Sequence, residues 1–402
     1  MPAMLKTSSS TLFVRLRGRA ACVAALALLG CSAPLAAAAP AQTTPAATAA
    51  SADTPRISNG NIRSVPAAGN LATQFKALVD QQVEPAWIAY TMPVIDSEQV
   101  GCCYGGRGGI YIDGDGGSCC GMCRLEDRPN GTADNTANVP GTRAAATPIK
   151  LEGSRSFAIL FRVMDRQIDK LRVFSSDCEL DAGGRTVHLL TGVRSADSLA
   201  LLDAMVQNPP TTSKSSSTKG AVLAIALHRD PAADPILQRL LTATYPDSIR
   251  RDAAFWLAKT RGRSGFEAVK RALNDTSAGS IRKHLVFAIT QSREPEATPT
   301  LIEMARNHPQ PDVRGEALFW MAQRAGAKTA ETITEAIDRD PDTEVKKKAV
   351  FALSQMPKDQ GVPLLINVAR TNTNPAVRKQ AMFWLGQSKD PRAVDFFAQV
   401  LK

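Results

Sequence analysis

Apolar positions in the second half of the chain recur every 32 residues and predict a series of helices. In the first clear copy, Ile249–Leu257, the apolar residues Ala253 and Leu257 follow at i+4 and i+8, on one side of a helix. Each copy has an aliphatic residue, a basic residue, and then an apolar run centred on phenylalanine. The phenylalanines are Phe255, Phe287, Phe319, Phe351 and Phe383.

A second apolar series with the same period predicts a partner helix in each unit. Its members are Val269, Leu301, Ile333, Leu365 and Phe397. Because a single helix pair cannot bury its apolar side, such units are stable only when they stack. Weaker copies at 198–206, 219–227 and 235–241 extend the series forwards. We therefore expect an α-solenoid over residues 196–402, ending on a helix at 393–401. The apolar Phe396, Phe397 and Val400 of that helix either pack inward or are covered by another chain.

The unit resembles a known family. The two-helix repeat, its length and the signature of Asp312-Val313-Arg314 and Asn374–Arg378 resemble bacterial HEAT repeats, including the short kind in phycobilisome-lyase-like proteins. The resemblance covers nearly half of the chain. It implies a surface that binds other proteins, and as an alternative it implies a HEAT-like lyase.

Residues 70–195 have a different character and predict a small cysteine-rich α+β domain. The pattern of 71–79 indicates a short helix. Alternating apolar residues at 156–163, followed by a second apolar stretch at 171–174, indicate a strand pair. The segment before this domain, 40–69, is rich in Ala, Pro and Thr, and we expect it to be a disordered tether.

Residues 1–39 have the pattern of a signal peptide. Four basic residues, among them Lys6 and Arg19, precede the apolar stretch 20–30. Leu28–Cys31 resembles a lipobox, which would make Cys31 a lipidated N-terminus; small residues at 37–39 offer an ordinary cleavage site instead. Both interpretations predict an exported protein, either periplasmic or anchored in a membrane as a lipoprotein.

The remaining cysteines are confined to the domain before the repeats. In an exported chain an even number of cysteines predicts disulfides. Two alternatives stay open: four thiolates, including Cys120 and Cys123, could hold zinc or an iron-sulfur centre, or Cys120-x-x-Cys123 could be redox-active. We predict disulfides without metal or cofactor. The candidates are Cys102, Cys103, Cys119, Cys120, Cys123 and Cys178.

The formal net charge of +10 suits attraction to acidic protein surfaces or to anionic lipids. Export and an aromatic content of 5% argue against a nucleic-acid partner. The basic residue of each repeat could grip a protein partner in the cell envelope. Alternatively, it could pair with an acidic side chain or a helix-end carbonyl of the stack. These residues are Arg250, Arg282, Arg314, Lys346 and Arg378.

Two further rows carry polar or aromatic groups. Trp256, Trp320 and Trp384 alternate with alanines, which favours packing between layers over an exposed stripe. Glutamines end four successive inner helices, at 291, 323, 355 and 387, and could form a hydrogen-bond ladder. We find no nucleophile motif, no HExxH and no phosphate loop, so we assign no catalytic residue and expect a non-enzymatic protein.

Overall fold

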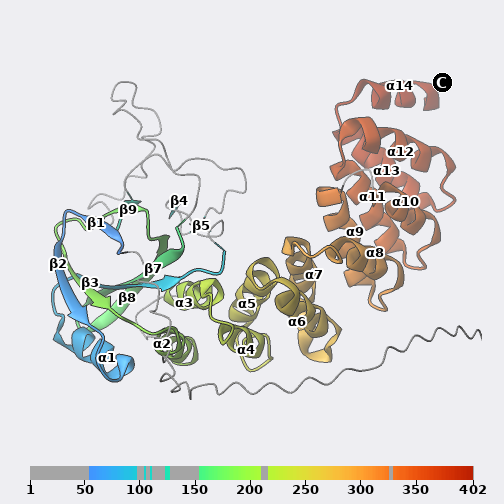
Figure 1. Ribbon diagram of the computed structural model, residues 1–402. Coiled ribbons are helices and arrows are strands. Elements are labelled where there is room, and N and C mark those ends of the chain that lie inside the picture. Colours follow the sequence, from blue (N-terminus) through green and yellow to red (C-terminus); the bar gives the residue numbers. More distant parts are fainter. Residues whose placement is uncertain are drawn as a thin grey trace, which may run out of the picture. The chain divides into compact units, whose positions relative to one another are not determined.

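The computed structural model describes residues 54–96, 104–105, 109–110, 123–126, 154–209, 216–325 and 329–401. A sheet-containing region with one helix comes first in the chain and is followed by paired helices (Figure 1). The predicted fold class, an α-solenoid preceded by an α+β region, is confirmed. The cysteine-rich character of that region falls largely on residues outside the described ranges.

A five-stranded sheet forms the centre of the first region, in the order β2-β10-β3-β7-β8. Its first three strands are parallel to one another, and β3, β7 and β8 are antiparallel. The predicted strand pair is the hairpin β7–β8. The strands are β2 Asn61–Pro66, β3 Ala86–Pro93, β7 Ser156–Met164, β8 Gln167–Ser175 and β10 Thr186–Thr191.

Both faces of this sheet are covered, which explains its nearly continuous apolar strands. Ile88 and Tyr90 of β3 face the larger core, to which helix α1 (Leu71–Gln81) contributes Phe75. Trp87 and Ala89 face a second, smaller core. The alternation of β7 therefore marks two buried faces rather than one buried and one exposed face.

The prediction of a disordered tether up to residue 69 is wrong for residues 56–66. Strand β1 (Arg56–Ser58) belongs to a three-stranded parallel sheet with β9 (Glu179–Asp181) and β6 (Cys123–Arg124). Strand β2 lies at the edge of the main sheet and pairs with β10. Most β2 side chains are exposed, so backbone pairing rather than apolar burial holds this strand in place. Strand β4 (Tyr104–Gly105) pairs antiparallel with β5 (Gly109–Ile110).

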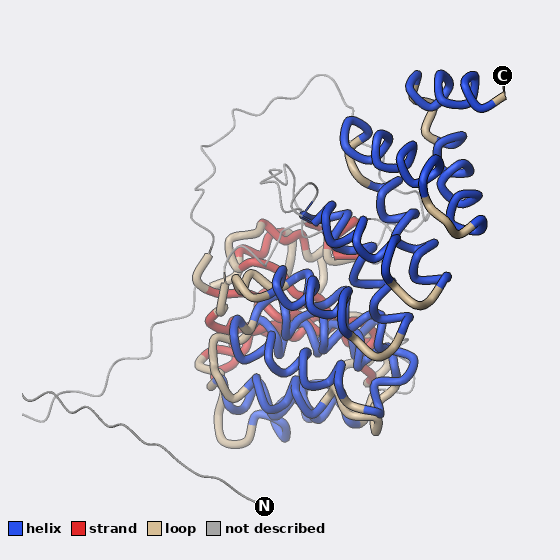
Figure 2. Tube along the Cα trace, turned by 90° about the vertical axis from the view of Figure 1, so that its right-hand side faces the viewer, coloured by secondary structure: helices blue, strands red, loops and turns tan. Residues whose placement is uncertain are grey.

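The second half of the chain consists of successive helix pairs (Figure 2). The predicted second helices of the five clear copies are α5 Asp247–Thr260, α7 Arg282–Gln291, α9 Pro311–Ala325, α11 Thr343–Gln355 and α13 Pro375–Gln387. We call these the inner helices. The outer helices are α4 Ala233–Arg239, α6 Gly262–Asn274, α8 Ala297–Asn307, α10 Ala330–Arg339, α12 Lys358–Thr371 and α14 Pro391–Val400. Before them come α2 Ser195–Gln207 and α3 Ser216–Leu227, and a 3-10 turn, η2 Thr276–Ile281, precedes α7.

The sheet and the helix pairs share one apolar core. The buried cluster that starts at Leu71 continues through α2 and α3 to Phe396 in the last helix. Gly220 of α3 allows this helix to lie close to Leu171 of β8. The last helix buries Phe396 but leaves Val400 exposed, so the expectation of inward packing holds for only part of it.

A buried polar network fixes the junction between the sheet and the helices. The hydroxyl of Ser198 in α2 donates to the Tyr90 hydroxyl at 3.0 Å and contacts His228 Nε2 at 3.0 Å. All three side chains are fully buried, and burial raises the pKa of the Tyr90 hydroxyl. The backbone beside His228 bridges to Val94, at the end of β3. The network thus links β3, α2 and the end of α3.

Gly265 marks a close contact between an inner helix and the outer helix that follows it. A Cβ at this position would lie 1.9 Å from the backbone oxygen of Leu257. We expect Gly265→Ala to lower the free energy of unfolding by about 1–3 kcal/mol, because a backbone atom cannot give way as a side chain can. Chemical denaturation followed by circular dichroism measures this change.

Gly386 supplies the matched control in helix α13. A Cβ there would meet nothing within 4 Å, and the position is exposed. Gly386→Ala should therefore stabilise the helix by about 0.5–1 kcal/mol, the usual cost of glycine in a helix interior. Equal effects of the two substitutions would contradict the close-contact account of Gly265.

Candidate binding surface on the inner helices

The phenylalanines of the inner helices form the centre of a continuous aromatic row. Ring centroids lie 4.6–6.1 Å apart at each step from Phe255 to Phe383, with Trp320 and Trp384 inserted between phenylalanines. The row follows from the sequence, since a 32-residue period places one Phe at the same height on every inner helix. These rings are half-buried, except that Phe383 is 53% exposed. We call this side of the inner helices the inner face.

The tryptophans belong to the layers between repeats, as the packing interpretation expects. Trp256 is 8% exposed, and Trp320 and Trp384 are half-buried against the core. The indole N–H of Trp320 donates to Glu316 at 2.8 Å. Trp384 has Gln380 in the corresponding position, and its Nε1 is buried without a hydrogen-bond partner among the described residues.

Four of the five first basic residues of the repeats donate hydrogen bonds to groups within the stack. Arg250 is 5% exposed, and its guanidinium donates to the carbonyls of Leu241 at 3.1 Å and Ser277 at 2.8 Å. Lys346 donates to Asp338 O at 2.7 Å. These carbonyls lie at or just beyond the ends of helices, where no intrahelical partner is available.

Arg314 and Arg378 show two versions of the same contact. Arg314 makes a bidentate pair with buried Asp340, at 2.7 and 2.9 Å, and this carboxylate raises the pKa of the guanidinium. Arg378, two repeats further on, donates to the backbone carbonyl of Asn372 at 2.9 Å, as Arg314 does to that of His308 at 3.0 Å, and no carboxylate among the described residues pairs with it. The geometry favours pairing within the stack over a partner-gripping role. Arg282 differs, because its Nε is buried without a hydrogen-bond partner in the described ranges.

A second basic row borders the aromatic row, one helical turn before each phenylalanine. It comprises Arg251, Lys283, Lys347 and Lys379, and Gly315 interrupts it. Lys348 of the neighbouring helix lies across this gap. A Cβ added to Gly315 would be 2.3 Å from Cδ of Lys348 and 3.2 Å from its Nζ. The row of positive charge is therefore continuous. Periodicity alone does not reveal this, since Lys348 is out of register by one residue.

Amide side chains border the aromatic row on its other side. Gln323 Nε2 donates to Gln355 Oε1 at 3.3 Å, so part of the proposed glutamine ladder is formed. Gln387 is exposed, and Gln291 is half-buried. Lys259 occupies the first position of this row, with its ammonium 5.5 Å from the centre of the Phe255 ring, and burial lowers its pKa.

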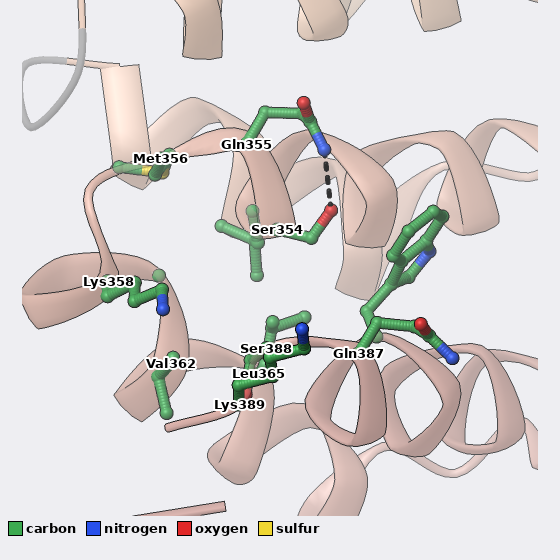
Figure 3. Close-up of a pocket in the computed structure, with 12 residues that line it drawn as sticks. Ser354, Gln355, Met356, Lys358, Val362, Leu365, Gln387, Ser388 and Lys389 are labelled. Carbon is green, nitrogen blue, oxygen red and sulfur yellow. Dashed lines mark hydrogen bonds between the residues drawn. The ribbon is translucent and has the colours of Figure 1, made fainter.

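A cavity of about 340 Å³ opens beside the amide row in the last two repeats (Figure 3). Met356, Val362 and Leu365 provide its apolar lining, and Lys358 and Lys389 also line it. Gln355 donates to the Ser354 hydroxyl at 3.1 Å, as the close-up shows. Trp384 belongs to both the cavity and the aromatic row, so the two features are contiguous.

The predicted cysteine sites lie mostly outside the described residues. Cys102, Cys103, Cys119 and Cys120 are not described, and Cys123 is described only through its strand. Cys178 is 2% exposed and belongs to the smaller core of the sheet. Within the described ranges, no three His, Cys, Asp or Glu side chains are grouped so that they could hold a metal ion. No helix in the same ranges is long and apolar enough to cross a membrane. Cys31 and residues 1–39 lie outside these ranges.

Comparisons with solved structures show distant likenesses. Human deoxyhypusine hydroxylase in complex with glycerol is 16% identical, with 50% of this chain and 77% of that chain covered and a TM-score of 0.22. An engineered protein is 17% identical, with 52% and 64% covered and a TM-score of 0.25. The CpcE–CpcF complex of phycocyanin lyase from Nostoc sp. PCC7120 is 15% identical, with 51% and 81% covered and a TM-score of 0.25. No functional argument rests on likenesses this distant.

The family model gives a direct assignment of the helical part. No curated protein matches the chain. Residues 233–322 and 330–402 match the model of HEAT repeats. The match covers the inner and outer helices from α4 to α14, in which the 32-residue period, the aromatic row and the arginine contacts recur. This C-terminal region therefore consists of HEAT repeats.

Proposed function

We propose that the protein is a non-enzymatic scaffold whose HEAT repeats bind another protein on the inner face. One observation carries this proposal: a half-exposed aromatic row, bordered by basic and amide side chains, runs across five inner helices without a break. Exposed and half-exposed aromatic rings supply much of the energy of protein recognition, and charged groups beside them add specificity. The Ser198–His228 contact is fully buried, so it offers no hydroxyl or imidazole that a substrate can reach.

Photocrosslinking in cells tests this proposal with the full chain. A photoreactive residue at Gln355, which is exposed on the inner face, should capture a discrete protein partner. The matched control carries the same residue at Arg271, which is exposed on outer helix α6. Capture from Arg271 equal to that from Gln355, or no capture from either position, would reject the inner face as the binding site.

We propose further that the partner lies in the cell envelope and that the chain is exported. The basic and apolar pattern of residues 1–39 supports export, and Leu28–Cys31 supports a lipid anchor. Mass spectrometry of the protein isolated from its native cells should find a mature N-terminus at Cys31 carrying acyl chains. An unmodified N-terminus near residue 40 would support periplasmic release instead, and an intact Met1 would contradict export.

For the cysteines we propose disulfides rather than a metal or redox centre. Strand β6 pairs with β9 so that Cys123 lies opposite Leu180, two residues beyond buried Cys178. This register brings the backbone of the cysteine-rich segment close to Cys178, which supports a cross-link between the two. Intact-mass measurement with a thiol reagent, before and after reduction, should show all six thiols protected without bound metal. Free thiols with stoichiometric zinc or iron would support the metal alternative.

A further inference from the structure

We infer that the inner face binds an extended acidic segment of the partner protein, with acidic residues about three positions apart. This inference rests on the proposed function and adds the chemistry of the partner. Three features of the described residues support it: the sign and continuity of the charge, the spacing of the repeats, and the cavity at the end of the row.

The inner face carries mainly positive charge, and much of this charge is exposed to solvent. Arg251, Lys283 and Lys379 are exposed and form no ion pair with another described residue, whereas Lys347 pairs with Glu344 at 2.8 Å. The acidic groups on this face are less available. Glu316 accepts the Trp320 indole N–H, and burial raises the pKa of Asp252. Positive groups without internal partners, beside a low-polarity aromatic row, favour a negatively charged ligand.

Continuity of the charge indicates a ligand that runs along the stack. Lys348 lies over Gly315, which fills the one gap in the second basic row. A compact anion would contact only one or two of these groups. An elongated chain that crosses successive inner helices can contact a basic group and an aromatic ring in each repeat.

The spacing of the helices suits a polyproline II segment. Packed helices lie about 8–10 Å apart. A polyproline II chain has three residues per turn and rises about 3.1 Å per residue, so every third side chain points the same way at about 9 Å intervals. A segment of about 15 residues with an acidic side chain at every third position would therefore match the five inner helices.

The cavity gives such a segment an anchoring point at its end. Lys358 and Lys389 line it together with the apolar side chains, and Gln355 and Gln387 border it (Figure 3). Nearby Asp390 is already paired with Arg392 at 2.9 Å. The volume of about 340 Å³ accommodates one or two side chains of a bound segment.

The arrangement of the rings favours a polypeptide over a nucleic acid. Bases bind single-strand proteins by stacking on open ring faces. Here Phe255 stacks on Phe287 with an interplanar angle of 18°, and Phe319 stacks on Phe351 at 5°. Each of these four rings therefore has its stacking partner within the row, which leaves less open ring face for a base.

Fluorescence anisotropy with the purified mature protein tests the inference. The probe is a labelled peptide of about 15 residues built from Glu-Pro-Pro units, and the comparison peptide replaces Glu with Gln. The acidic peptide should bind at least about 10-fold more tightly than the neutral one at low salt, and the difference should shrink as salt is added. The double variant Lys283→Glu/Lys379→Glu should weaken binding of the acidic peptide by about 10-fold or more.

The control variant reverses the same amount of charge on an outer helix. Lys270→Glu/Arg271→Glu lies on α6, away from the aromatic row, and should change the affinity by less than about 2-fold. Circular dichroism of both variants checks that the helices are retained. Equal binding of the two peptides, or equal effects of the two double variants, would overturn the inference. Tighter binding of a thymidine oligonucleotide than of the acidic peptide would also overturn it, in favour of a nucleic-acid ligand.

A final arm separates this inference from the proposed function. The photoreactive residue at Gln355 is combined with Lys283→Glu/Lys379→Glu in cells. Loss of the captured partner supports an acidic segment as the ligand. Undiminished capture means that the repeats bind a protein by other groups, so the inference fails while the scaffold function stands. No capture even without the charge reversal means that the scaffold function itself fails.

Discussion

Replacement of Arg314 by alanine should lower the free energy of unfolding by about 3–5 kcal/mol. Asp340 is almost inaccessible, and Arg314 is the cation that holds both of its carboxylate oxygens. Removal of the guanidinium leaves a charged group buried without its counter-ion and also frees the carbonyl of His308, which accepts from Arg314 at 3.0 Å. The shift of the urea unfolding transition, with hydrogen exchange of α9–α11 to localise the effect, measures the change.

Arg378, two repeats further along the chain, provides a matched control for this prediction. Arg378 occupies the same register and donates to the Asn372 carbonyl as Arg314 does to that of His308, but no carboxylate among the described residues pairs with it, so Arg378→Ala exposes no buried charge. That substitution should cost about 1 kcal/mol, as expected for hydrogen bonds to carbonyls. The double variant Arg314→Ala/Asp340→Asn should recover much of the lost stability. If Arg314→Ala costs no more than Arg378→Ala, the buried carboxylate is not what makes Arg314 important.

Acidification from pH 6.5 to pH 4 should destabilise the protein through His228, by up to about 3 kcal/mol. Burial lowers the pKa of His228 to about 4; Asp230 opposes this shift and Arg261 adds to it. In the unfolded chain the pKa is near the ordinary value of 6.5. The folded state therefore resists protonation over this interval while the unfolded state takes up a proton. The stabilising contribution is complete above pH 6.5 and is lost as the pH falls towards the folded pKa of about 4.

The variant His228→Gln isolates this contribution from the other histidines. Glutamine keeps a polar group near Ser198 but does not titrate, so the variant should lose less stability on acidification than the parent chain. Burial also lowers the pKa values of His188, His284 and His308, so these histidines contribute a background slope in both proteins. Free energies of unfolding measured at several pH values provide the comparison. Parallel pH profiles would show that His228 is not the group responsible.

The periodic part of the fold could be predicted because every repeat packs against its neighbours through the same positions. Phe287 and Phe319 are separated by 32 residues, the length of one repeat, so they occupy equivalent positions on successive inner helices. Both are half-buried in the aromatic row. The strand pair β7–β8 also followed from local pattern. In both cases the pattern lies in residues that are close in sequence, and the elements that it predicts contact each other in the fold.

Features that depend on backbone pairing or on neighbouring repeats could not be predicted. Most side chains of strand β2 are exposed, so the composition of this segment resembles that of a tether. Its backbone nevertheless pairs with β10. The role of Arg250 depends on carbonyls at Leu241 and Ser277, which lie outside the periodic motif. Lys348 covers Gly315 only because two helices pack side by side, and the sequence period places them one residue out of register.

The apolar core that continues from Leu71 to Phe396 has a consequence for synthesis of the chain. Strand β10 ends at Thr191, so the main sheet can close before any helix pair has left the ribosome. Helices α2 and α3 then meet a finished apolar surface, and each later pair meets the pair before it. Nascent helices are thus covered in the order in which they are made. In α14, the last of the described helices, Val394 and Val400 are exposed to solvent.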